Sequence, residues 1–276
     1  ETLGGAQMHS EISGLSDYLA EDEMDALRLC REVVSHLNWK KSEPQIESLP
    51  EEPIYDSDDL LGLVSKDLKT PFDVREAIAR FTDGSRFEEF KPLFGPTIIC
   101  GWADVHGYPV GIVGNNGAIY PDSAQKAAHF IQLCNKIDTP IIFLQNVTGF
   151  LVGKEFERDG IIKKGSQLIN AVSNSTVPHI TIILGASYGA GTYAMSGRAY
   201  NNRFTFTWPS AKIAVMGGKQ IAGVMSLVRK ARAFRKGEKF NEDEDKKFTE
   251  AVAKIQDQGS KALEATGLIS DDGIID

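Results

Sequence analysis

Residues 180–195 read ITIILGASYGAGTYAM, and this stretch decides the fold of the chain. Residues 180–184 are apolar and mostly β-branched, which predicts a short buried strand. Residues 191–199 are rich in apolar side chains and contain no proline, which predicts the opening of a helix. The chain therefore turns from a strand into a helix through Gly189 and Gly191.

Such a turn places unpaired backbone groups next to small residues. The first N–H groups of a helix have no partner within the helix, and glycine lets a ligand approach them closely. Backbone amides in this position can stabilise a polarised oxygen. Two interpretations are open on the spacing alone: a ligand-binding turn, or only a close crossing of strand and helix.

Strands and helices alternate from residue 97 onward. After a short helix over residues 73–81, the predicted strands cover residues 97–105, 108–113, 141–145, 181–184 and 204–207, and the predicted helices cover residues 122–137, 160–175, 191–199 and 218–236. His106 and Gly107, between the first two strands, are typical of a hairpin turn. This alternation predicts an α/β domain with helices packed against a sheet.

Four glycine-containing loops follow predicted strands. They are residues 113–117, 146–153, 189–191 and 215–218. If the strands lie side by side, these loops gather at one edge of the sheet, where open α/β folds bind ligands. The four loops together favour a ligand-binding edge over ordinary turns.

The first part of the chain is organised differently. Apolar residues at helical spacing predict a helix over residues 21–38. Residues 40–59 carry three prolines and many acids, which predicts a linker. We therefore predict a boundary near residue 55, between residues 1–54 and a domain of residues 55–276. Both ends of the chain have the appearance of cuts from a longer protein, since Glu1 replaces an initiator methionine.

Composition narrows the function classes. The chain has 276 residues, 42% of them hydrophobic and 25% charged, as globular proteins do. A net charge of -8 argues against nucleic acid as the main partner. A basic run over residues 229–239 is followed by acids at 242–245, which favours a solvated helix face. No stretch approaches the ~20 apolar residues that a membrane-spanning helix needs.

The pattern offers no metal site and no side-chain nucleophile. Cys30, Cys100 and Cys134 lie far apart in apolar surroundings, as expected of buried thiols in a reducing compartment. The five histidines show no zinc-ligand spacing. A phosphate loop and a nucleophile elbow are absent, and no histidine is evidently related to Ser187, so a serine hydrolase is rejected. The interpretation that remains consistent with the sequence is chemistry carried out by backbone amides.

Several segments in one order resemble the carboxyltransferase (beta) subunit of biotin-dependent acyl-CoA carboxylases. They are FLQN (143–146) with TGF (148–150), GIIKKG (160–165), GAG (189–191), WP (208–209) and AVMGG (214–218), together with LGGA (3–6) and DGIID (272–276) near the ends. Within the family the chain looks most like the methylcrotonyl-CoA or geranyl-CoA carboxylase branch. The propionyl-CoA branch usually reads Asp-Val-Pro-Gly-Phe where this chain has NVTGF at 146–150.

The resemblance implies a crotonase-like superhelix of repeated β-β-α units. Residues 1–54 would hold the tail of an N-terminal carboxyltransferase domain and a linker, and residues 55–276 the C-terminal carboxyltransferase domain. The implied reaction moves a carboxyl group from carboxybiotin to an acyl-CoA similar to methylcrotonyl-CoA, at a site between two subunits. The family's oxyanion hole corresponds to the backbone amides of Ala190 and Gly191. The further biotin- or substrate-binding positions that it implies, with no metal, are Gly149, Phe150, Tyr188, Gly189, Gly217 and Gly218.

The resemblance also implies partners. Biotin would be carried on a biotin carboxylase or biotin carrier subunit, and the carboxyltransferase subunits would form a homo-oligomer in the bacterial cytoplasm or the mitochondrial matrix. Two alternatives are the carboxyltransferase subunit of a biotin-dependent decarboxylase and a non-catalytic assembly scaffold. Small residues at 189–191 favour catalysis, because a scaffold does not need accessible amides.

Residues 226–258 predict a helix, a polar turn and a second helix. Asn241 stands before four acids and is a good N-cap for the second helix, whose apolar stripe would be Phe248, Val252 and Ile255. This hairpin either covers part of the site or contacts a neighbouring subunit, or it is a solvated hairpin without functional contact.

Overall fold

The computed structural model describes residues 4–37, 48–64, 70 and 72–275, and the chain divides into two compact units, residues 1–45 and 46–276. The division falls before the predicted boundary near residue 55. Residues 40–47 of the predicted linker lie outside the described residues. Residues 48–55 are attached to the second unit, because Ser48 Oγ donates to Asp104 at 2.9 Å and the Ile54 amide donates to Ser85 Oγ at 2.8 Å.

The first unit confirms the helix predicted over residues 21–38. After the short helix α1 (Ala6–Met8) and a π-helical turn (His9–Ser13), α2 (Glu23–His36) begins at Asp22, whose side chain accepts from the Asp25 amide at 2.8 Å. No described residue of this unit is buried. Cys30 is therefore exposed, and the prediction of a buried thiol is wrong at this position.

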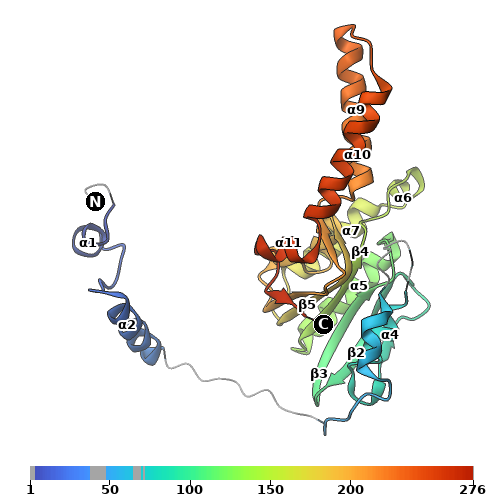
Figure 1. Cartoon of the computed structure of the whole chain (residues 1–276). Helices are drawn as coiled ribbons and strands as arrows, with labels where there is room; N and C mark the ends of the chain where they lie inside the picture. The colour runs from blue at the N-terminus through green and yellow to red at the C-terminus, as the bar shows by residue number, and fades with distance from the viewer. Residues whose placement is uncertain (1–3, 38–47, 65–69, 71, 276) are drawn as a thin grey trace. The chain divides into compact units, whose positions relative to one another are not determined.

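The second unit is built on one mixed sheet, drawn in Figure 1. Its strands are β1 (Glu88–Phe90), β2 (Ile98–Val105), β3 (Tyr108–Asn115), β4 (Ile141–Val147), β5 (His179–Tyr188), β6 (Phe204–Thr207), β7 (Lys212–Ala214) and β8 (Gly273–Ile274). The strand order is β1-β2-β3-β4-β5-β6-β8, and β7 pairs with the end of β5. β1, β2 and β3 pair antiparallel, whereas every pairing from β3 to β8 is parallel. The α/β fold predicted from the alternation is confirmed.

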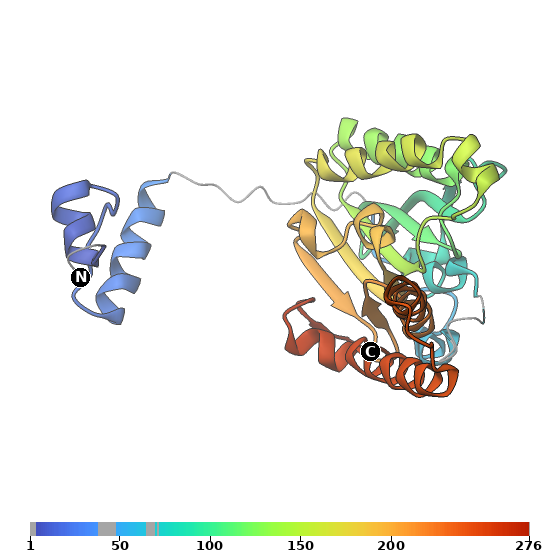
Figure 2. The same ribbon diagram turned by 90° about the horizontal axis from the view of Figure 1, so that it is seen from above.

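Helices cover the sheet. They are α3 (Leu60–Leu63), α4 (Val74–Ile78), α5 (Pro121–Lys136), α6 (Lys154–Arg158), α7 (Ile161–Ser173), α8 (Ala190–Ala194), α9 (Gly218–Lys236), α10 (Glu242–Gly259) and α11 (Ala262–Gly267). In Figure 2 the green α5 and yellow-green α7 lie along one side of the sheet, and the red α10 and α11 lie on the other. One core joins the sheet to α5, α7 and α8 and includes Phe130, Phe143 and Leu168. A second core surrounds α4 and includes Ile112 and Leu144.

The strand–helix turn at residue 189 differs in length from the prediction. β5 runs from His179 to Tyr188, well beyond the predicted 181–184, and α8 ends at Ala194 instead of continuing to residue 199. Ser196 has a φ of 53°, and its carbonyl accepts from Thr181 Oγ1 at 2.6 Å. The helix ends at this left-handed residue, because the Gly197 amide turns back to the Thr192 carbonyl at 2.8 Å.

The helical hairpin after residue 217 is confirmed. α9 and α10 pack along each other (Figure 1), and Asn241 caps α10 by accepting from the amides of Asp243 at 3.1 Å and Glu244 at 3.2 Å. Phe248 lies under the Arg229 guanidinium, whose carbon atom is 4.2 Å from the ring centre. Ile255 is 72% exposed, so the predicted apolar stripe is wrong at its last member. Among the described residues, no helix is long and apolar enough to cross a membrane.

Candidate active site at the carboxyl edge of the sheet

The four predicted glycine loops follow β3, β4, β5 and β7, which are all parallel, so they leave the sheet at the same edge. The loops also touch one another. Ile119, just after the first loop, donates to the Gly149 carbonyl and accepts from the Leu151 amide, both at 3.1 Å, which joins it to the second loop. The Gly189 amide donates to the Ala214 carbonyl at 3.1 Å, which joins the third loop to the fourth. The predicted gathering of the loops is confirmed.

Gly191 lies where the second and third loops cross. A Cβ at this position would stand 2.5 Å from Val147 Cγ2 and 3.2 Å from Gly149 Cα, far inside normal carbon contact. Gly191 is buried, and its φ is negative, as in any helical residue. Glycine is therefore needed here for close packing, and not for an unusual backbone angle.

Gly189 supplies the unusual angle. Its φ of 56° and ψ of -140° reverse the chain between β5 and α8, and residues with a side chain rarely adopt this conformation. A Cβ would also lie 3.0 Å from the Val215 carbonyl oxygen. The turn is thus specified by glycine both in backbone angle and in space.

α8 begins with free amides. No side chain caps it, and within the described part of the chain neither the Ala190 nor the Gly191 amide donates to any acceptor. Ala190 itself is exposed. The first amides of a helix carry partial positive charge, so these two groups can bind an oxygen that becomes negative.

An apolar groove adjoins this helix start. Its volume is about 610 Å³, and it is lined by Ala190, Tyr193, Val215, Ile269 and their neighbours. Tyr193, Val215 and Ile269 are exposed. The groove offers an apolar surface beside two hydrogen-bond donors, the arrangement that small-molecule sites usually have.

Tyr188, Gly217 and Gly218 lie together on the side of α9 and α10. A Cβ on Gly217 would be 3.8 Å from the Tyr188 ring, and one on Gly218 would be 2.5 Å from the Ala253 carbonyl oxygen and 2.9 Å from Asp257 Oδ1. Burial, and then the negative charge of Asp257, raises the pKa of the Tyr188 phenol. The phenol therefore keeps its proton near neutral pH and can donate a hydrogen bond.

Gly149 and Phe150 have different roles in the packing. Gly149 has a φ of 134°, a Cβ on it would meet no atom within 4 Å, and its α-carbon faces Gly191. The Phe150 ring packs against Gly165 of α7, where a Cβ would lie 2.9 Å from Phe150 Cε1. The structure thus places the Gly149 backbone against the start of α8, whereas the Phe150 ring lies against α7.

Three polar residues of this edge were given no site role in the sequence analysis, although two of them, Gln145 and Asn146, belong to the FLQN motif. Buried Gln145 donates from Nε2 to the carbonyls of Thr192 at 3.3 Å and Met195 at 3.4 Å. These bonds hold the end of α8 against β4. Asn115 and Asn146 link β3, β4 and β5. A polar side chain that ends an apolar strand is the signal that could have revealed all three.

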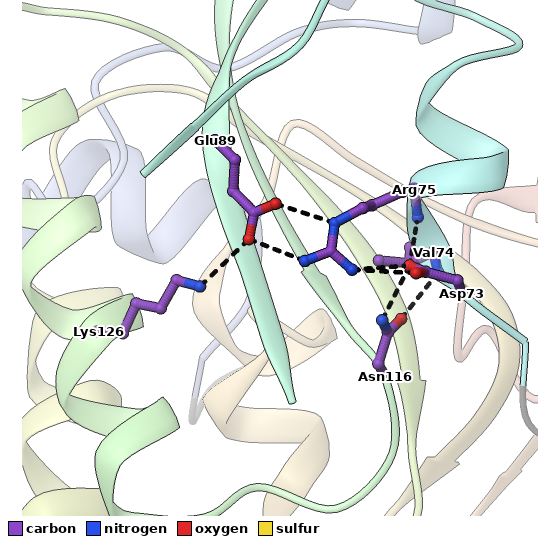
Figure 3. A network of polar contacts seen from close by, with 6 residues as sticks. All are labelled: Asp73, Val74, Arg75, Glu89, Asn116 and Lys126. Atoms are coloured by element: carbon purple, nitrogen blue, oxygen red, sulfur yellow. Dashed lines mark hydrogen bonds and ion pairs between the residues drawn. The ribbon is translucent and has the colours of Figure 1, made fainter. Parts of the chain in front are cut away.

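A network of charged groups supports the first loop from behind, as Figure 3 shows. Arg75 donates from Nε and Nη2 to the two oxygens of Glu89, each at 2.9 Å, and from Nη1 to Asp73 at 3.0 Å. Asn116 Nδ2 donates to Asp73 Oδ1 at 2.9 Å. Lys126 is fully buried, and its ammonium lies 3.5 Å from Glu89. The network ties α4, β1 and α5 to the residue that follows β3.

The described residues do not provide what a metal site or a side-chain nucleophile would require. They contain no group of three or more histidine, cysteine or acidic side chains that could hold a metal ion. Ser187 Oγ pairs with Thr192 Oγ1 at 2.9 Å, and His179 pairs instead with Ser196 at 2.8 Å and Ser175 at 2.7 Å. Burial raises the pKa of the Cys134 thiol to about 12, so this thiol is not a nucleophile.

Comparisons with known proteins show the family of the chain. The carboxyl transferase domain family matches residues 1–276. The probable biotin-dependent acyl-coenzyme A carboxylase beta2 subunit of Mycobacterium tuberculosis is 53% identical over all of this chain and 52% of its own length. The mitochondrial methylcrotonoyl-CoA carboxylase beta chain of Dictyostelium discoideum is 46% identical over all of this chain and 47% of its own length.

Solved structures give the same result. The beta subunit of Pseudomonas aeruginosa geranyl-CoA carboxylase superimposes with a TM-score of 0.78 at 44% identity, over all of this chain and 52% of that one. The transcarboxylase 12S structure superimposes with a TM-score of 0.74 at 31% identity, over 99% of this chain and 52% of that one. The chain spans about half the length of these relatives. It belongs to the carboxyl transferase domain family, in the branch of the methylcrotonyl-CoA and geranyl-CoA carboxylase beta subunits, as its motifs predicted.

Proposed function

We propose that this chain is the C-terminal carboxyltransferase domain of a biotin-dependent acyl-CoA carboxylase, and that it acts on an acyl-CoA similar to methylcrotonyl-CoA. The observation that carries the proposal is the free start of α8 at the edge where four loops meet. A family relationship alone does not require unpaired amides at this place. The exposed apolar groove beside them supports the same conclusion.

The residues present fit carboxybiotin. Carboxybiotin brings the carboxyl group on a ureido nitrogen, next to a ureido oxygen that gains negative charge when the group is released. The amides of Ala190 and Gly191 would donate to this oxygen, and each well-placed donor of this kind lowers a barrier by about 3 kcal/mol. Gly189 and Ala190 line the groove beside these amides, and Tyr193 and Val215 offer an apolar wall.

The remaining functional predictions follow from the family. We propose a crotonase-like arrangement of β-β-α units, of which β2, β3 and α5 form one. The first unit, residues 1–45, would belong to an N-terminal domain, and the apolar exposed face of α2 supports this assignment. The acyl-CoA would be held largely by that domain, biotin would come on a partner subunit, and the carboxyltransferase subunits would form an oligomer, for which the transcarboxylase relative is described as a hexamer.

A backbone donor can be removed by proline, which makes Ala190 the position to test. Ala190 is the first residue of α8, where proline is tolerated in helices, and its side chain is exposed. Ala190→Pro should lower kcat for carboxylation of methylcrotonyl-CoA about 10²- to 10³-fold. Ala190→Ser keeps the amide and should stay within a few-fold of wild type.

The assay uses the full-length subunit that contains this chain, purified with its biotin-carrying partner. Circular dichroism and the thermal midpoint report whether each variant is folded. A folded Ala190→Pro subunit with turnover equal to that of Ala190→Ser would refute the amide assignment.

A further inference from the structure

The parallel pairing of β4 and β5 is broken just before the site. Gln145 pairs with Ile183 and Val147 pairs with Ser187. One residue of β4, Asn146, therefore stands opposite three residues of β5, which are residues 184–186. The two extra residues of β5 form a bulge, and the strand leaves this bulge directly into the Tyr188–Gly189 turn.

The Asn146 side chain fills the bulge. Its Oδ1 accepts from the amide of Ala186, a residue of the bulge, at 2.9 Å. Gly185 passes so close that a Cβ there would overlap Asn146 Oδ1. The side chain thus substitutes for the missing part of the β4 backbone.

Asn146 is itself held from the other side. Its amide donates to Asn115 Oδ1 at 2.8 Å, and its carbonyl accepts from Asn115 Nδ2 at 2.6 Å. Asn115 is buried, and the next residue, Asn116, joins the network of Figure 3 by accepting from the Val74 amide at 2.7 Å. Asn146 therefore stands in a fixed frame when it meets β5.

We propose that Asn146 is a positioning residue: it sets the register in which β5 enters the turn, and through it the direction of the Ala190 and Gly191 amides. In a regular ladder Val147 would pair with Gly185 rather than Ser187. That shift of two residues corresponds to about 7 Å along the strand. The catalytic consequence rests on the proposed function, whereas the structural consequence does not.

Three variants of the full-length subunit test the proposal. Asn146→Leu has a similar size but no acceptor, and Asn146→Ser keeps a polar group that is too short to reach the Ala186 amide. Asn146→Asp keeps the accepting oxygen and serves as the rescue. The matched control is Asn135→Leu, which removes an equally well-bonded asparagine that joins α5 to Ser175 and Thr176 and forms no hydrogen bond to residues 141–147 or 186–195.

Hydrogen exchange of residues 186–195 and the split between kcat and KM are the two measurements. Asn146→Leu and Asn146→Ser should speed exchange in this segment at least 10-fold and lower kcat about 10²-fold, with a KM for acyl-CoA within a few-fold of wild type. Asn146→Asp should resemble wild type in exchange, and Asn135→Leu should lower the thermal midpoint without changing exchange in this segment or kcat.

Wild-type exchange of residues 186–195 in folded Asn146→Ser would overturn the proposal. An equal effect of Asn135→Leu would overturn it as well, since the effect would then reflect general destabilisation. If the wild-type subunit transfers no carboxyl group, the proposed function fails, but the exchange measurement still decides whether Asn146 sets the register.

Discussion

Substitution of Gly191 by alanine tests the packing that brings the second and third loops together. The new Cβ would stand 2.5 Å from Val147 Cγ2, about 1 to 1.5 Å inside normal carbon contact. Val147 is fully buried in the core beneath α8, so it cannot turn away into solvent. Overpacking of this kind costs about 1–3 kcal/mol, and α8 is expected to move outward with its amides.

A double-mutant cycle isolates this contact. Val147→Ala alone removes two methyl groups from a closed core and should cost about 2 kcal/mol. In the double variant the methyl group introduced at position 191 would occupy the space that Val147 leaves, so the two costs should not add. We expect a coupling of about 1–3 kcal/mol in favour of the double variant, measured as the free energy of unfolding of residues 1–276 in urea.

Gly223 provides the control. It lies in the interior of α9 and has no atom within 4 Å of a Cβ position. Gly223→Ala should therefore raise the free energy of unfolding by about 0.5–1 kcal/mol. Additivity of Gly191→Ala and Val147→Ala within about 0.5 kcal/mol would show that the inferred overlap does not determine the cost.

Three further predictions concern pH, assembly and the isolated chain. Burial lowers the pKa of His179 to about 4, so the unfolded chain binds more protons than the folded chain between about pH 6.5 and 4. The free energy of unfolding should therefore fall by about 3 kcal/mol as the pH drops through this window. Urea unfolding at several pH values should show this slope in the wild type and not in His179→Gln. If the α9–α10 hairpin contacts a neighbouring subunit, Phe234→Asp on the exposed face of α9 should weaken assembly in sedimentation velocity without lowering the thermal midpoint. Unchanged assembly would favour a solvated hairpin. Residues 1–276 alone should show no carboxyl transfer to methylcrotonyl-CoA, since the proposed site is completed by another domain, and turnover like that of the full-length subunit would show that the site is complete within them.

Local sequence determined the elements whose signals are contained within one segment. Apolar runs and helical spacing were enough for β4, α5, α7 and α9, and the turn at His106–Gly107 and the cap at Asn241 need only neighbouring residues. The Gly-Ala-Gly turn after β5 was found for the same reason, as was its place beside the other glycine loops, because parallel strands leave a sheet at one edge.

Only the tertiary structure decided features that join distant residues. β7 and β8 are two or three residues long and exist because β5 and β6 offer them partners, so no local pattern predicts them. Lys126 carries a charge on a helix yet is fully buried, since Glu89 of another element lies beside it. The bulge at Asn146 likewise depends on how β4 and β5 come into register. The sequence alone therefore located the glycine turn, but the direction in which its amides point is set by contacts that form only when the strands pair.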